Sequence, residues 1–453
     1  MRKHLWLVGL FIISTSFAKG WKAGVSKVVI TPKEAIWQAG YASRTHASEG
    51  KLHDLWAKAV ALEDENGQRS VLVTTDMLGF PKAMSDRIRS QLQARFGLSK
   101  ANVLLNSSHT HSGPVLYDAL HDIYPLNAAE EVKIDQYSRW LEGQVVELIG
   151  NALKNLEPVE LFSQNGVTRF QVNRRNNKEG ALLEQTELKG PNDYAVPVIK
   201  AVTPKGKLKA IVFGYACHPT VLDLYALSGD YPGFAQIELE KAHPEATALF
   251  FQGAAGDQNP LPRRTVSLAK QYGKELAAAV ERVLEEPMKP LSAQFQSAYS
   301  EVTLPLSAPP TEAQLLKIQQ TEAPYMQRWA TRLLSEMKQG KPFVSSYAYP
   351  IQLWKLGEQA LFSFGGELVI EYAIECKKRY GTDIFVAAYS NDVMGYIPSA
   401  TILKEGGYEG QSSQMVYGLP SVWDASVPSL IYAEIDKLAK QIKLVTLVTL
   451  APK

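Results

Sequence analysis

Histidines that directly follow apolar runs are the residues of this sequence best suited to metal binding or proton transfer. The chain has only eight histidines, and three of them, His109, His111 and His218, follow segments with the apolar pattern of buried strands. Imidazole binds metal ions and exchanges a proton near neutral pH. His109 and His111 point the same way if the backbone between them is extended. The bare His-x-His motif is weak, because ordinary polar roles explain it too, but the shared position at strand ends favours a metal site.

A carboxylate and two tyrosines follow glycines later in the chain. Glu367 comes after Gly365-Gly366, which allow a close backbone approach and a sharp entry into a helix. A negative charge is favoured at a helix start, so that structural role explains Glu367 as well as a functional role does. Tyr396 and Tyr408 lie in glycine-containing loops, and their spacing alone does not distinguish them from surface tyrosines.

Apolar runs alternate with amphipathic segments, which predicts an α/β fold with a mixed β-sheet core flanked by helices. Two pairs of runs predict hairpins, turning at 204–206 and at 357–358. The predicted strands are 70–75, 102–105, 196–203, 207–215 with its buried run at 210–216, 246–251, 349–356, 359–364 and 383–388. The predicted helices are 82–96, 130–156, 265–284, 311–338 and 368–379, with a final helix and strand in 426–450.

Several predicted strands run straight into short polar loops. These loops carry His109 and His111, His218, the segment 253–259, Glu367, and Asn391 with Tyr396. All strands end in polar loops, but most strand ends do not carry histidine or Gly-Gly-Glu. Because sites in α/β proteins gather beyond the carboxyl ends of strands, we expect these loops to form one cleft.

Composition and the N-terminus indicate an exported globular protein. Of the 453 residues, 45% are hydrophobic and 21% charged, and the net charge of +2 gives no basic field for nucleic acid. Residues 1–18 have a positive start, an apolar run and small residues, which is typical of a secretory signal peptide and predicts a secreted or periplasmic protein. The apolar run is shorter than the roughly 20 residues of a membrane span, and no later segment looks transmembrane. We expect Cys217 and Cys376 to be free, buried thiols.

Taken together and in order, these blocks resemble the neutral (non-lysosomal) ceramidase family over nearly all of 19–453. The most specific block is Ser-His-Thr-His-Ser-Gly-Pro at 108–114. It is supported by Gly-Val-Ser-Lys-Val-Val-Ile-Thr-Pro at 24–32, by Cys-His-Pro-Thr at 217–220 and by the segment 390–410. The resemblance implies one zinc hydrolase domain at 19–453.

The resemblance also implies a role for each matching residue. It assigns four zinc ligands, which suit Zn²⁺ chemically, and three residues that line the reaction centre. Water on the zinc would attack the substrate carbonyl, the oxyanion would be stabilised by one of the lining residues, and His111 or Tyr408 would pass a proton to the leaving amine. The implied ligands are His109, His218, Glu367 and Tyr396, and the implied lining residues are His111, Arg174 and Tyr408.

The sequence departs from the family pattern in two places. The family has serine in a Gly-Asp-x-Ser-Pro-Asn block, where this chain has Asn259 within Gly-Asp-Gln-Asn-Pro. Asparagine is no nucleophile, although it can hydrogen-bond water or a carbonyl, so a mechanism based on zinc-bound water is favoured over one that needs a serine. We also expect the chain to lack the family's C-terminal β-sandwich domain.

These observations predict an exported, zinc-dependent hydrolase of an N-acyl amide, acting on a ceramide-like lipid or on another N-acylated small molecule. Two alternatives stay open. The zinc site can serve an ester or a glycan linkage, or the chain can be a non-catalytic, metal-containing binding protein. The oligomeric state is not indicated by the sequence.

Overall fold

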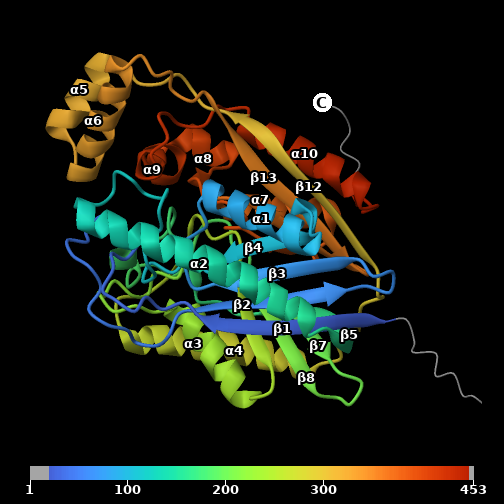
Figure 1. The fold of residues 1–453 in the computed structure, drawn as a ribbon. Coiled ribbons are helices and arrows are strands. Elements are labelled where there is room, and N and C mark those ends of the chain that lie inside the picture. Colours follow the sequence, from blue (N-terminus) through green and yellow to red (C-terminus); the bar gives the residue numbers. More distant parts are fainter. Residues whose placement is uncertain (1–19, 448–453) are drawn as a thin grey trace, which may run out of the picture.

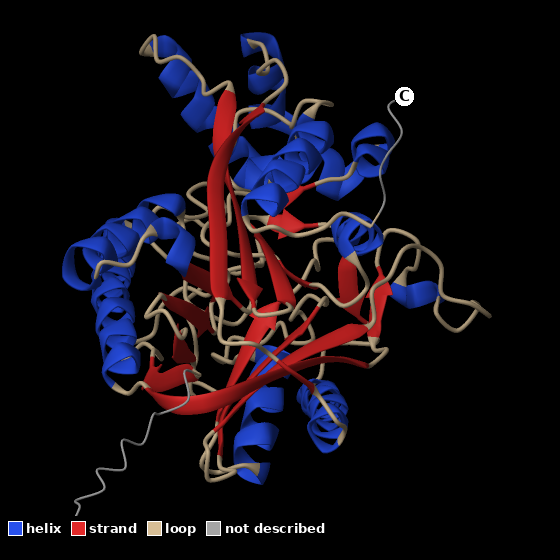
Figure 2. Ribbon diagram, turned by 90° about the vertical axis from the view of Figure 1, so that its right-hand side faces the viewer, coloured by secondary structure: helices blue, strands red, loops and turns tan. Residues whose placement is uncertain are grey.

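The computed structural model describes residues 20–447, and this part of the chain folds into two large β-sheets with helices on their outer faces, together with two short two-stranded sheets (Figures 1 and 2). The larger, nine-stranded sheet has the order β4-β3-β2-β1-β5-β7-β8-β9, with β11 paired to β5. Its strands are β1 (Trp21–Val29), β2 (Trp56–Glu63), β3 (Arg69–Thr75), β4 (Val103–Ser107), β5 (Glu157–Val167), β7 (Ala195–Val202), β8 (Leu208–Tyr215), β9 (Thr247–Gln252) and β11 (Lys289–Pro290).

The smaller sheet packs against the inner face of the larger one. It contains β12 (Phe295–Pro305), β13 (Ser346–Leu356), β14 (Gln359–Phe364) and β16 (Phe385–Ala387). Alternate side chains of a strand point to opposite faces. Thus Leu104 and Leu249 join Trp354 and Leu361 of the smaller sheet in one apolar cluster, whereas their sequence neighbours face the helices.

Helices cover both outer faces, which completes a helix–sheet–sheet–helix arrangement. The larger sheet is covered by α1 (Lys82–Phe96), α2 (Ala128–Lys154), α3 (Asp230–Ala242) and α4 (Val266–Glu285), and the smaller sheet by α7 (Ile370–Tyr380) and α10 (Val427–Gln441). The helices α5 (Glu312–Thr321) and α6 (Pro324–Lys338) project together beyond the end of β12 and β13 (Figure 1). The predicted mixed α/β core flanked by helices is confirmed, with two sheets in place of one.

The side chain of Asn106 ties together strand ends from the two sheets. Its Nδ2 donates to the backbone oxygen of Ala388 at 2.7 Å, and its Oδ1 accepts from the backbone nitrogen of Gln252 at 2.9 Å. The ends of β4, β9 and β16 are therefore held side by side, and the loops that follow these strands start from one place.

Three expectations need correction. The predicted helix 311–338 is broken into α5 and α6, because Ala323 precedes Pro324 and a residue before proline is disfavoured in helical conformation. Residues 444–447 form no strand, and the rest of that predicted strand lies outside the described residues, as does the predicted signal peptide. The strands β1, β2, β5 and β12 were not predicted from the sequence.

The two cysteines agree with expectation. Cys217 and Cys376 are both buried and unbridged. Within residues 20–447, no helix combines the length and the apolar character needed to cross a bilayer.

Candidate metal centre

Three histidines converge beyond the ends of β4 and β8. His109 follows β4 by two residues and His218 follows β8 by three. Nε2 of His109 lies 3.3 Å from Nε2 of His111, and a ligand atom from each of the three histidines lies within 4.8 Å of the other two. His109 and His218 are almost completely buried, so three imidazoles meet in a small volume that can hold a metal ion.

Backbone carbonyls orient the rings of His109 and His218. Nδ1 of His109 lies 2.7 Å from the oxygen of Leu78, and Nδ1 of His218 lies 2.5 Å from the oxygen of Ala255. Since a carbonyl only accepts, each Nδ1 carries a proton and each Nε2 is turned towards the centre, which is the usual orientation of metal-binding histidines.

The backbone at His109 differs from the expected extended form. His109 has φ of +66°, a left-handed conformation that few non-glycine residues adopt, and its N–H donates to the oxygen of Met77. The rings of His109 and His111 still meet, but they do so because the chain bends sharply at His109.

Glu367 faces both buried histidines. Its Oε2 lies 2.9 Å from Nε2 of His218 and 3.2 Å from Nε2 of His109. Glu367 was expected at a helix start, but α7 begins only at Ile370. It lies instead in a short strand, β15 (Glu367–Leu368), paired in parallel with β17 (Tyr396–Ile397), and the register places Glu367 directly beside Tyr396.

The protonation states of these groups suit a divalent cation. Burial works to raise the pKa of Glu367, but the adjacent His109 and His218 hold it well below its ordinary value. Burial lowers the pKa of His218 to about 4, and burial together with the neighbouring histidines lowers that of His111 well below its usual range. Imidazole nitrogens beside an ionised carboxylate form a donor set that Zn²⁺ accepts, so the residues fit the metal that the sequence suggests.

Arg174 connects this cluster to Tyr396. Its Nη2 donates to the hydroxyl oxygen of Tyr396 at 3.0 Å, and that oxygen lies 3.5 Å from Nε2 of His218. Burial raises the pKa of Tyr396 well above its usual value, and the charge of Arg174 opposes this rise. Arg174 itself is fixed by Glu409, whose Oε1 accepts from its Nε at 2.8 Å. The guanidinium therefore holds the hydroxyl of Tyr396 beside His218.

Tyr408 and Asn259 also contact Arg174. The Tyr408 ring is 5.3 Å from the Tyr396 ring, centre to centre, and the Arg174 guanidinium is 5.8 Å from the centre of the Tyr408 ring. Asn259, in β10 (Gln258–Pro260), pairs with Val172 of β6 (Gln171–Asn173), and its Oδ1 accepts from Nη1 of Arg174 at 3.4 Å. The structure thus brings all eight predicted site residues into one connected group.

A cavity of about 700 Å³ opens onto this group. It is lined by His111, Arg174, Asn259, Tyr396 and Tyr408, together with residues of the loops around 40, 177, 220 and 263. His109, His218 and Glu367 lie behind this lining, out of contact with bulk solvent. A substrate bound in the cavity would have the histidine and carboxylate cluster at its inner wall.

Comparison with known proteins agrees with this arrangement. Residues 21–280 match the model of the neutral/alkaline non-lysosomal ceramidase family, N-terminal part. The chain belongs to this family. Membership supports a hydrolase, and the matched region contains His109, His111, Arg174, His218 and Asn259.

Individual relatives of this ceramidase-family chain are distant. Neutral ceramidase B of Dictyostelium discoideum is 28% identical over 246 residues, covering 49% of this chain and 33% of the relative. Neutral ceramidase of Pseudomonas aeruginosa is 26% identical over 254 residues, covering 53% and 37%. The crystal structure of the Pseudomonas enzyme superimposes with a TM-score of 0.73 at 18% identity, over 96% of this chain and 77% of that one. The matched sequence spans only about a third of each of these relatives, and the superposition shows a shared fold.

Two tyrosines that contact the candidate metal centre were not identified from the sequence. Tyr389 packs its ring 4.4 Å from that of His109, centre to centre, and Tyr417 donates from its hydroxyl to Oε1 of Glu367 at 2.5 Å. Tyr389 directly follows a predicted strand, so the strand-end argument applied to it as well. Nothing in the spacing of Tyr417 indicates its contact with Glu367.

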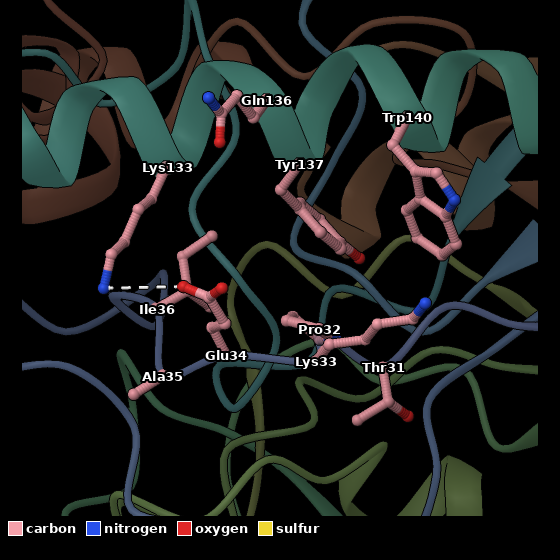
Figure 3. A pocket seen from close by; sticks show the side chains of 10 residues that line it. All are labelled: Thr31, Pro32, Lys33, Glu34, Ala35, Ile36, Lys133, Gln136, Tyr137 and Trp140. Atoms are coloured by element: carbon pink, nitrogen blue, oxygen red, sulfur yellow. Dashed lines mark ion pairs between the residues drawn. The ribbon is translucent and has the colours of Figure 1, made fainter.

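A second cavity, of about 280 Å³, lies under α2 and away from the candidate metal centre. Figure 3 shows Tyr137 and Trp140 projecting from α2 towards the loop 31–36, with an ion pair of 3.8 Å between Lys133 and Glu34. None of its lining residues is histidine or cysteine, and none is shared with the cavity at His111. This cavity offers no comparable chemistry.

Proposed function

We propose that residues 19–453 form an exported, Zn²⁺-dependent hydrolase domain that cleaves an N-acyl amide. The observation that carries the proposal is the convergence of Nε2 of His109, Nε2 of His218 and Oε2 of Glu367, with both imidazoles oriented by backbone carbonyls. The amide class is supported by the relatives, which are named neutral ceramidases, and by membership of their family.

We assign His109, His218, Glu367 and Tyr396 as the zinc ligands and His111 as a proton-transfer group. The reason lies in the second ring nitrogen. Metal-binding histidines usually hold that nitrogen in a hydrogen bond, as His109 and His218 do, whereas Nδ1 of His111 is buried without a partner among the described residues. When bound, Zn²⁺ supplies Lewis acidity and lowers the pKa of a water ligand to about 7.

The remaining residues bind the substrate and move its protons. Hydrolysis forms a bond between a water oxygen and the acyl carbon and breaks the bond to nitrogen, with a proton passing from the water to the amine. His111 is neutral near pH 7 because its pKa is lowered, so it can accept that proton and deliver it to the leaving nitrogen. The phenol of Tyr408, 43% exposed at the cavity, can donate to the oxyanion as charge develops.

Asn259 supports water as the attacking group. Its amide side chain lines the cavity and accepts a hydrogen bond from Arg174, but it has no nucleophilic oxygen. Asn259 therefore serves to hold Arg174 and to orient polar groups in the cavity.

A screen of the purified mature chain tests the proposal. N-acylsphingosines, N-acyl amino acids, N-acyl sugars and the matching esters are incubated with the protein, and products are identified by mass spectrometry. We expect release of a carboxylic acid and an amine, loss of this activity after chelation, recovery with Zn²⁺, and loss of at least about a hundredfold in His109→Ala and His218→Ala. Unchanged activity in both variants would overturn the proposal, and turnover of esters alone would reassign the bond cleaved.

Export is tested separately. We expect the protein recovered from the producing cell to begin near residue 19 and to lie outside the cytoplasm, because residues 1–18 have the pattern of a cleaved signal peptide. Intact-mass measurement of cytoplasmic and exported fractions decides this, and an intact N-terminus in the cytoplasmic fraction would contradict it.

A further inference from the structure

Positive side chains dominate the wall of the cavity at His111. Five cationic residues line it, and three carboxylates line it with them. The cations are Arg174, Arg175, Lys178, Arg263 and Arg264, and the carboxylates are Glu179, Glu405 and Glu409. The wall keeps an excess of positive charge after these groups are paired.

All three carboxylates form ion pairs with arginines of the same wall, namely Arg174, Arg175 and Arg263. Glu409 accepts from Arg174 at 2.8 Å and from Arg175 at 2.7 Å. Glu405 accepts from Arg175 at 2.8 Å, and Glu179 accepts from Arg263 at 3.0 Å. None of the lining carboxylates is left for the two other cations of the wall.

Arg264 and Lys178 are these two cations. Lys178 is exposed and has no ion-pair partner among residues 20–447. Nε of Arg264 lies 3.5 Å from Oδ2 of Asp223, a residue outside the lining, and these side chains are 36% and 47% exposed. An ion pair this long and this exposed stabilises little, so Arg264 remains available to an anion.

Arg264 is held close to the reaction centre. Its guanidinium lies 5.3 Å from the centre of the Tyr41 ring and donates to the Tyr41 hydroxyl at 3.1 Å. The centre of that ring is 4.8 Å from the centre of the His111 ring. Arg264 has φ of +86°, which costs energy in a non-glycine residue, and its N–H donates to the oxygen of Val221 at 2.7 Å. The loop thus keeps a guanidinium one aromatic ring away from His111.

The rest of the wall is polar. Oγ1 of Thr220 is buried in the lining and has no hydrogen-bond partner among the described residues, and Asn176 and Asn177 also line the cavity. Leu261 is the one aliphatic side chain of the lining. Pockets that bind apolar molecules are lined mainly by hydrophobic side chains, so this wall is poorly suited to long alkyl chains.

We propose that the preferred substrate is an N-acyl amide whose amine part is small and carries a carboxylate, as in an N-acylated amino acid. The planar guanidinium of Arg264 binds the carboxylate, Lys178 adds its charge, and the amide lies against His111. The distance of one aromatic ring between Arg264 and His111 suits an amine part of amino-acid size. This inference rests on the proposed amide hydrolysis.

Binding of a stable analogue tests the carboxylate site without turnover. In the ketomethylene analogue of N-octanoylglycine a CH₂ replaces the amide NH, and its methyl ester is the neutral match. Calorimetry with the zinc-loaded protein should give at least about tenfold tighter binding of the acid than of the ester. Arg264→Gln should abolish most of this preference and Arg264→Lys should keep part of it.

Arg282→Gln is the matched control, because Arg282 is an exposed arginine on α4 that does not line the cavity. It should bind acid and ester as the unaltered protein does, and circular dichroism checks that each variant is folded. Equal binding of acid and ester by the unaltered protein overturns the inference. So does a preference for the acid that survives both Arg264→Gln and Lys178→Gln.

Turnover separates this inference from the proposed function. We expect a higher kcat/KM for N-octanoylglycine than for its methyl ester or for N-octanoylsphingosine. If the chain hydrolyses the neutral amides better than the acid, amide hydrolysis stands and the carboxylate preference is wrong. If it binds the acid analogue through Arg264 but hydrolyses no amide, the carboxylate site stands and the proposed function is wrong.

Discussion

The hydroxyl of Tyr417 donates to Oε1 of Glu367 at 2.5 Å, while Oε2 of the same carboxylate faces the Nε2 atoms of His218 and His109. One oxygen of Glu367 is thereby fixed by a half-buried phenol, and the other is left for the centre. Such outer contacts restrict the orientation of a metal ligand. Tyr417 therefore acts on the proposed metal site through Glu367.

Replacing Tyr417 with phenylalanine should weaken zinc binding without unfolding the chain. The variant loses the hydrogen bond that orients Glu367, and loss of such a contact typically costs about 10- to 100-fold in metal affinity. Competition with a chromogenic chelator measures the Kd for Zn²⁺. Tyr432→Phe on α10, which packs against Tyr372, is the control and should keep the original affinity. Equal affinity in Tyr417→Phe and Tyr432→Phe would refute the role of Tyr417.

Gly40 allows the backbone to approach the ring of His111 closely. A Cβ at Gly40 would lie 2.4 Å from Cγ and Nδ1 of His111, and the φ of +101° is itself strained for alanine. Gly40→Ala should displace the imidazole and lower kcat/KM about a hundredfold while zinc content is retained.

Gly50→Ala provides the matched control for Gly40→Ala. Gly50 has φ of +104°, but a Cβ there meets nothing within 4 Å. This variant bears the same backbone strain without contact with His111, so its activity should be unchanged and its stability should fall by only roughly 1 kcal/mol. Equal activities of the two variants would contradict the positioning of His111 by Gly40.

Asp392 should make folding stability depend on pH. Burial raises its pKa from 3.8 to about 7 in the folded chain, where Oδ2 accepts from the hydroxyl of Tyr347 at 2.7 Å. Between these values the folded state keeps a proton that the unfolded state has released. Its contribution is complete below pH 4 and is lost as the pH rises to about 7, at about 1.4 kcal/mol per pH unit.

Asp392→Asn removes this titration and keeps an acceptor for Tyr347. Urea unfolding between pH 4.5 and 7.5 should show a smaller fall in the free energy of unfolding for this variant than for the unaltered chain. Asp118→Asn, at an exposed aspartate, should leave the pH profile unchanged. If Asp392→Asn and Asp118→Asn give the same profile, burial of Asp392 does not have the assigned effect.

Restoring the family serine should not create a ceramidase. In the proposed mechanism water attacks the acyl carbon, and Asn259 serves to hold Arg174. Asn259→Ser should therefore give no marked gain in hydrolysis of N-acylsphingosine, measured as released fatty acid, with Asn259→Ala as the control for loss of the amide. A strong gain in Asn259→Ser alone would show that a serine nucleophile is what the chain lacks.

The strand ends were the part of the site that the sequence predicted well. The apolar runs of β4 and β8 are short and sharply bounded, so the loops after them, with His109 and His218, could be located. The helices α1 and α4 were also predicted closely, because their apolar residues recur at helical spacing.

Contacts between distant segments could not be predicted. The bond from Tyr417 to Glu367 and the bonds of Asn106 join segments far apart in sequence, and no local pattern encodes them. The left-handed bend at His109 was missed too; there the N–H of His109 donates to the oxygen of Met77, a residue distant in the sequence. Glu367 was expected at a helix start, but its pairing with Tyr396 in β15 and β17 determines its place.

Metal content tests the central claim most directly. The purified chain and its variants are equilibrated with Zn²⁺, desalted, and measured by inductively coupled plasma mass spectrometry. We predict about one tightly held Zn²⁺ per chain, lost in His109→Ala, His218→Ala and Glu367→Ala and retained in His111→Ala. A chain that holds no zinc, or full zinc content in His109→Ala and His218→Ala, would contradict the account.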